Sequence, residues 1–137
     1  AAAFARAAHV TTLSMRNQRL VANPIEPRSA IANVEEGRLV LYTPSQTPTG
    51  TRQALAEGVF GIGVREARVV VGDIGGGFGL KVGLAPEEVT TCFAARQLGR
   101  PVRWRAERSE DFLAAHQGRE QSFDAALALD ADGRILA

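Results

Sequence analysis

The sequence has only one cysteine, and this scarcity excludes several kinds of site. Cys92 has no partner for a disulfide, a CxxC redox pair or a cysteine-rich zinc site. An excess of charge of one sign is also missing, because 16 basic residues nearly balance 15 acidic ones and both are scattered along the chain. Without a basic patch or an acidic tail, charge predicts neither nucleic-acid binding nor a solvating arm.

Long apolar segments are missing as well. No run approaches the roughly 18 to 20 apolar residues that span a bilayer, so we expect no membrane span. The alanine-rich start, Ala1 to Ala8, has no basic opening and is not typical of a signal peptide. It also lacks an initiating Met, which suggests a fragment of a longer protein. One unpaired cysteine fits a reducing compartment, and we expect a cytoplasmic location.

The rest of the composition, 45% hydrophobic and 23% charged residues among 137, is typical of one globular domain or part of one. Alternation and turn signals predict about six strands and two helices. The expected strands are 10–21, 29–34, 38–43, 66–71, 101–105 and 123–129. The expected helices are 53–57, after Thr49 or Thr51 as N-cap and ending at Gly58, and a clearer one from Pro86 to Gly99.

Two hairpins are expected among these strands, one through Glu35-Glu36-Gly37 and one through the turn Asp130-Ala131-Asp132-Gly133. A strand-loop-helix-strand unit lies between them. This mixture predicts an α+β (mixed α/β) fold with a mixed sheet, rather than a doubly wound parallel sheet.

The strongest chemical signal is a strand that runs into a loop with four glycines in five positions. The loop reads Ile74-Gly75-Gly76-Gly77-Phe78-Gly79-Leu80-Lys81. Glycine permits positive φ and has no Cβ, so backbone N–H groups can converge on an anion or a flat cofactor. A GxGxxG motif would need glycine in place of Leu80, and a P-loop would need Ser or Thr in place of Val82. Neither nucleotide motif fits, and a tightly packed turn without a ligand stays the alternative.

This loop resembles the GGGFG loop of the molybdenum hydroxylases, the family of xanthine dehydrogenase, aldehyde oxidase and aerobic carbon monoxide dehydrogenase. Segments on both sides resemble the same family in the same order, so the resemblance covers nearly the whole chain. They are Asn23-Pro24-Ile25-Glu26-Pro27-Arg28, Ser45-Gln46-Thr47-Pro48, Pro86-Glu87-Glu88, Gly99-Arg100-Pro101-Val102-Arg103-Trp104 and Glu107-Arg108-Ser109-Glu110-Asp111.

The resemblance implies that residues 1–137 are part of the molybdopterin-binding domain of a large subunit, in an oxidoreductase that hydroxylates small molecules with water as oxygen source. It implies that Gly76, Gly77, Phe78 and Gly79 lie at the cofactor. It implies no protein ligand to the metal, because the dithiolene sulfurs of the pterin hold it. The family's catalytic glutamate belongs to a later part of the subunit, so we expect no catalytic residue here and no activity of this chain alone.

The resemblance further implies molybdenum-molybdopterin in its cytosine dinucleotide form, with [2Fe-2S] and FAD on partner subunits. Two positions differ from the family. A cofactor-contacting glutamine would fall near Leu20 and Val21, and Val82 stands where purine-oxidising members carry a substrate-binding glutamate. Val offers no charge and no hydrogen bond, so we expect an aldehyde, an aromatic heterocycle or carbon monoxide as substrate rather than xanthine. The alternative function is a non-catalytic binding or structural domain.

Other polar residues have structural interpretations. Glu26 and Arg28, flanked by prolines, are expected to brace an extended segment rather than to form an acid–base pair. Cys92 is expected to be a small core residue. His9 and His116 lie far apart in the sequence and are expected to be surface or locally paired histidines rather than metal ligands. The remaining group is expected to form a solvated or ion-paired face. It comprises Arg100, Arg103, Arg105, Arg108, Glu107, Glu110 and Asp111.

Overall fold

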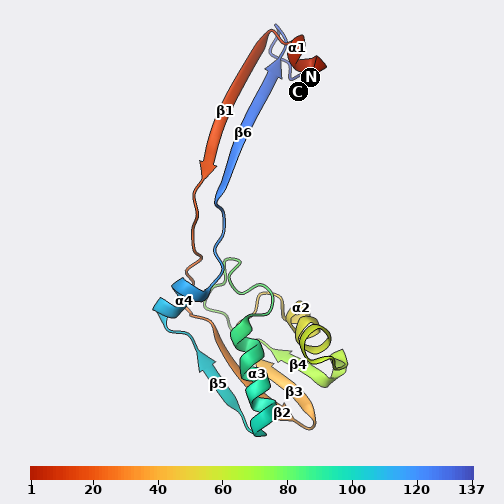
Figure 1. Cartoon of the computed structure of the whole chain (residues 1–137), viewed down its shortest axis with the longest axis vertical. Helices are drawn as coiled ribbons and strands as arrows, with labels where there is room; N and C mark the ends of the chain where they lie inside the picture. Colours follow the sequence, from red (N-terminus) through yellow and green to blue (C-terminus); the bar gives the residue numbers. More distant parts are fainter. The chain divides into compact units, whose positions relative to one another are not determined.

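The computed structural model describes the whole chain, residues 1–137, which divides into two compact units (Figure 1). The first unit comprises residues 1–20 and 118–137, and the second comprises residues 21–117. The length argument for one domain did not predict this division. None of the helices is both long and apolar enough to cross a membrane.

The first unit is a two-stranded antiparallel ribbon. It holds helix α1 (Ala2–Ala5) and strands β1 (His9–Asn17) and β6 (Gln121–Leu129). The two strands pair along their whole length, from His9 opposite Leu129 to Asn17 opposite Gln121. The expected hairpin after β6 is short: Asp130 N donates to Arg134 O at 3.0 Å across the turn, and one bridge joins Leu129 to Ile135.

The second unit contains a four-stranded mixed sheet in the order β4-β3-β2-β5. Its strands are β2 (Ser29–Glu35), β3 (Arg38–Tyr42), β4 (Ala67–Val70) and β5 (Val102–Arg105). β3 and β4 are parallel, whereas the β2–β3 and β2–β5 pairs are antiparallel. The predicted α+β class and mixed sheet are confirmed. The predicted hairpin is confirmed too, with Glu36 and Gly37 at φ 49° and 79°, as a two-residue turn of the primed type requires.

Helix α3 (Pro86–Leu98) covers one face of this sheet (Figure 1). It begins with Pro86, whose missing N–H costs nothing in a first turn, and ends at Gly99 in the left-handed conformation, so both predicted ends are correct. Small side chains line the contact on both elements, which lets the helix approach the sheet closely. They are Ala30 and Ala32 of β2 and Cys92 and Ala95 of α3, all essentially inaccessible to solvent.

The other helix prediction was wrong at both ends. Helix α2 (Pro48–Gln53) begins earlier and continues into a π-helical segment, η1 (Ala54–Phe60), followed by the 3-10 turn η2 (Val64–Glu66). Proline occupies the first turn of α2, and the chain leaves η1 at Gly61, which has φ 61°. Gly61, rather than Gly58, therefore supplies the left-handed residue that ends a helix.

A helix that was not predicted, α4 (Arg108–Ala114), carries part of the expected solvated or ion-paired face. The Glu110 carboxylate accepts the Glu107 N–H at 3.3 Å, which satisfies one free donor at the helix start. Asp111 is 3% exposed. Glu110 and Asp111, which were expected on a solvated or ion-paired face, therefore lie in the first turn of a packed helix.

Arg28 joins three elements of this unit. Its Nε and backbone N–H donate to Asp111 of α4 at 2.9 and 3.0 Å, and its Nη1 and Nη2 donate to Glu87 of α3 at 2.9 and 3.1 Å. The guanidinium also lies 5.6 Å from the ring centre of Trp104 in β5. Burial lowers the pKa of Arg28, but the hydrogen bonds that Arg28 donates to Glu87 and Asp111, together with their charges, outweigh it, and the net pKa is raised.

Replacing Arg28 by methionine should therefore destabilise the second unit strongly. The change leaves the buried Asp111 carboxylate without the guanidinium that neutralises its charge. Breaking one side of a buried ion pair costs about 3–5 kcal/mol. Urea unfolding of Arg28→Met measures this loss. Arg105→Met is the matched control, since Arg105 is exposed and makes no ion pair, and it should change stability by less than about 0.5 kcal/mol. Equal losses in both variants would contradict a central role for Arg28.

Candidate functional site

The glycine loop (residues 75–81) follows β4 and ends in a tight turn. Leu80 N donates to Gly77 O at 2.9 Å, and the two residues between them, Phe78 and Gly79, have φ 53° and 88°. A turn with two positive φ angles is unusual for phenylalanine, whose side chain here is 76% exposed. The turn therefore presents the Phe78 ring and its peptide groups outward.

Gln46 fills the inside of this turn. Its Oε1 accepts hydrogen bonds from Gly79 N at 3.0 Å and Lys81 N at 3.3 Å. The backbone N–H of Gln46 donates to Lys81 O at 2.9 Å. A Cβ on Gly77 would lie 2.8 Å from Gln46 Cγ. Gly77 is thus required by the approach of Gln46, and its φ lies outside the left-handed region.

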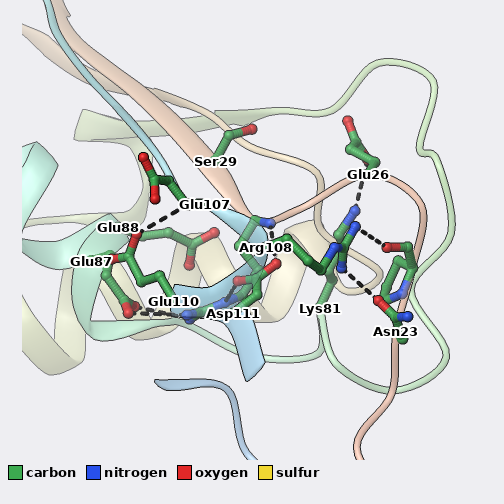
Figure 2. Close-up of polar contacts among 12 residues, drawn as sticks. Asn23, Glu26, Ser29, Lys81, Glu87, Glu88, Glu107, Arg108, Glu110 and Asp111 are labelled. Carbon is green, nitrogen blue, oxygen red and sulfur yellow. Dashed lines mark hydrogen bonds and ion pairs between the residues drawn. The ribbon is translucent and has the colours of Figure 1, made fainter. Parts of the chain in front are cut away.

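Glu26 holds both ends of the loop. One carboxylate oxygen, Oε2, accepts from the Lys81 ammonium at 2.7 Å (Figure 2) and from Gly75 N at 2.9 Å, and Glu26 N donates to Gly75 O at 3.1 Å. Burial raises the pKa of Glu26, but the hydrogen bonds from Lys81 and Gly75, together with the Lys81 charge, outweigh it. The net pKa of Glu26 therefore lies below its ordinary value.

The segment that carries Glu26 is held by Arg108, the first residue of α4. Its Nη1 donates to Asn23 Oδ1 at 2.6 Å, and its Nη2 donates to the carbonyls of Pro24 and Ile25 at 2.7 and 2.8 Å (Figure 2). Arg108 makes no ion pair with the neighbouring acids. Its predicted place on a solvated or ion-paired face was wrong, because five donors in a rigid plane suit several carbonyl acceptors at once.

A cavity of about 290 Å³ opens beside the end of the loop. Lys81, Val82, Trp104 and His116 are among the residues that line it. The His116 Nε2 atom lies 3.2 Å from Gly79 O, so this histidine is locally paired with the loop, which is one of the two states expected for it. Val82 is half exposed and contributes no polar atom from its side chain.

Three successive peptide groups of the loop remain free to bind something else. The N–H groups of Gly76, Gly77 and Phe78 donate no hydrogen bond within the chain, although Gly77 is buried. Gly79 differs from them, because its N–H is taken by Gln46. Gly76 has φ 95°, a backbone conformation that glycine adopts without strain. Successive free N–H groups of this kind form an anion-binding or dipole-binding concavity.

The structure also locates the other candidates. Glu26 and Arg28 form no pair with each other and serve structural ion pairs, as expected. Cys92 is a buried core thiol, and burial, with the nearby Glu88 charge, raises its pKa to about 12. His9 lies in the ribbon. No group of three His, Cys, Asp or Glu side chains in the chain is placed to hold a metal ion.

The residue that sequence reasoning missed is Gln46. It was noted only within the segment 45–48, while a glutamine was sought near Leu20 and Val21. The glycine-rich sequence of the loop gave no signal that the side chain of Gln46, distant in the sequence, would be its acceptor. The crowding around Gly77 is the structural signal, because it appears only when Gln46 is in place.

Comparison with known proteins identifies the family of this chain. The sequence model of the molybdopterin cofactor-binding domain family matches residues 1–137. The chain belongs to the molybdopterin cofactor-binding domain family of the molybdenum hydroxylases. The predicted membership of the molybdenum hydroxylase family is thereby confirmed, and the family supports molybdenum-molybdopterin as the cofactor.

Three relatives illustrate the similarity. The nicotine 6-hydroxylase large subunit of Paenarthrobacter nicotinovorans is 35% identical over 97% of this chain and 16% of its own length. The carbon monoxide dehydrogenase large chain of Hydrogenophaga pseudoflava is 36% identical over 98% and 17%. The crystal structure of quinoline 2-oxidoreductase from Pseudomonas putida 86 superposes with a TM-score of 0.89 at 39% identity, over 98% of this chain and 17% of that one. This molybdopterin-binding chain thus spans about a sixth of the length of these relatives.

Gln46→Leu should loosen the turn of the glycine loop. Leucine leaves Gly79 N–H and Lys81 N–H without their acceptor, and each lost hydrogen bond is worth about 1 kcal/mol, so their amide exchange should accelerate by roughly 10- to 30-fold. Hydrogen exchange followed by NMR measures the change. Gln46→Glu keeps an acceptor of the same length and should preserve the protection. Unchanged exchange in Gln46→Leu would show that the carboxamide does not hold the turn.

Proposed function

We propose that this chain places the glycine loop beside the molybdenum-molybdopterin cofactor in the large subunit of a hydroxylating oxidoreductase. The observation that carries the proposal is the row of free N–H groups at Gly76, Gly77 and Phe78. They lie in a loop whose backbone is held by hydrogen bonds to Gln46 and Glu26, so the free groups keep a fixed direction. When bound, the cofactor supplies the two-electron oxidation of the substrate.

The residues present fit such a group. Gly76, Gly77 and Phe78 would offer N–H donors to its oxygen atoms, and Gly79 would supply the positive φ that brings Phe78 to the turn. The donors are neutral dipoles, which stabilise developing negative charge without adding a proton to be lost. The chain has no cluster of metal-binding side chains, so it suits a group whose metal arrives with its own ligands.

Cofactor form and partners extend this proposal. We infer the cytosine dinucleotide form of the pterin, with [2Fe-2S] and FAD carried by partner subunits that remove the electrons. The relatives are named as a large subunit, a large chain and subunit gamma of a dehydrogenase complex, which supports an assembly of several chains. A cytoplasmic location stays a prediction from the single, buried cysteine.

The substrate class rests on Val82. It lines the cavity beside the loop and offers neither charge nor hydrogen bond, so a polar purine ring finds no partner there. We propose an aldehyde, an aromatic heterocycle or carbon monoxide as the substrate. The three relatives described above are named for nicotine, quinoline and carbon monoxide, which supports this range.

Gly77→Val tests the position of the loop. In the full-length subunit with its partners, the added side chain would collide with Gln46 and displace the loop, so molybdenum content and turnover should both fall by about tenfold or more. Gly72→Val is the control, because a Cβ there meets nothing within 4 Å. Normal metal content and normal rate in Gly77→Val would place the loop away from the cofactor and favour a structural role.

A substrate panel tests the role of Val82. The full complex should oxidise an aldehyde, quinoline or carbon monoxide with a kcat/KM at least about 100-fold above that for xanthine, because unpaired polar groups of a purine cost several kcal/mol. Val82→Glu should raise the kcat/KM for xanthine. Xanthine as the preferred substrate of the unmodified complex would show that Val82 does not decide specificity.

A further inference from the structure

We propose that Glu26 is the positioning residue of the glycine loop: its single oxygen Oε2 closes the loop by joining Gly75 to Lys81, and this contact sets the direction of the free N–H groups. The inference rests on the proposed function, in which those groups face the cofactor. It concerns a residue that touches the loop and not the reacting atoms.

The hydrogen bonds divide the loop into two halves with different supports. Gln46 holds the second half through Gly79 and Lys81. Between the end of β4 and Gly77, the only backbone groups with a partner are the N–H and the carbonyl of Gly75, and both are bound to Glu26. The half that carries the free N–H of Gly76 therefore depends on Glu26 alone for its polar contacts.

Packing points to the same residue. A Cβ on Gly75 would lie 2.5 Å from the Cβ of Glu26, so the two backbones touch directly. Gly76 faces Pro24, where a Cβ would come within 3.3 Å of the proline ring. The segment 24–26 is itself fixed by the three hydrogen bonds of Arg108. Glu26 thus transmits the position of α4 to the first half of the loop.

Charge explains why a glutamate is needed at this place. The Lys81 side chain is 2% exposed, and its ammonium has no other carboxylate within reach, whereas Glu26 is 35% exposed. An ammonium buried without a partner is strongly unfavourable. Loss of the Glu26 charge would therefore drive Lys81 out of its position and open the end of the loop, which no neutral acceptor could prevent.

The test uses the full-length subunit in its complex, with four variants of the pair. Glu26→Gln removes the charge at nearly equal shape, Glu26→Asp keeps the charge, Lys81→Met removes the ammonium, and Glu26→Gln/Lys81→Met removes both. Hydrogen exchange of the loop peptides is measured with and without cofactor, together with molybdenum content, turnover and global unfolding. Glu36→Gln is the control, because Glu36 is exposed in the β2–β3 turn and makes no ion pair.

Glu26→Gln should accelerate exchange across residues 75–81 by about tenfold or more, because the buried ammonium then lacks its partner. Glu26→Asp should recover a large part of the protection, and the double variant should exchange more slowly than Glu26→Gln alone. Glu36→Gln should behave as the unmodified protein. If Glu26→Gln fails to fold, the aspartate and double variants still decide the question, since neither leaves an unpaired buried charge.

Unchanged loop exchange in folded Glu26→Gln, or no recovery in both Glu26→Asp and the double variant, would overturn the positioning role. A second outcome separates this inference from the proposed function. Faster loop exchange with normal molybdenum content and normal turnover would confirm that Glu26 positions the loop and would contradict the placement of the loop at the cofactor. Failure of Gly77→Val alone would leave the exchange result for Glu26 intact.

Discussion

The second unit depends on the ion pairs of Arg28, which bring β2, α3 and α4 together at one point. A guanidinium with 11% of its side chain exposed meets Asp111 at 3% and Glu87 at 22%. Charges taken out of water in this way are stable only when each has a partner with good geometry. The planar fork of arginine meets that condition, because it serves both carboxylates at once and stacks near Trp104. The ion pair with Arg28 holds α4 in a position from which its first residue, Arg108, reaches the segment that carries Glu26.

That first residue, Arg108, carries the constraint to the candidate site. It binds the carbonyls of Pro24 and Ile25, the next residue is Glu26, and Glu26 binds both ends of the glycine loop. The loop is therefore held by a series of charged hydrogen bonds, with Gln46 as a neutral support within the turn. The free N–H groups of the loop lie at the end of this series.

Sequence reasoning succeeded where one residue decides a local geometry. The β2–β3 turn, the start of α3 at Pro86 and its end at Gly99 follow from positive φ and a missing N–H. It failed where two glycines could each end a helix, as at Gly58 and Gly61. It also failed in α4, where the distant partners of the charged residues could not be seen in the sequence. At the site, Gln46 was overlooked, and the contact between His116 and Gly79 was not predicted.

The sequence by itself determined the family, the mixed sheet and the glycine loop, because these are expressed in residue types, spacing and order along the chain. Only the tertiary structure decided which side chains hold the loop. Glu26 and Lys81 are 55 positions apart, and Gln46 and Gly79 are 33 apart. Their meeting depends on the strand order β4-β3-β2-β5 and on α4 packed against Arg28, and no local periodicity encodes a contact between such distant residues.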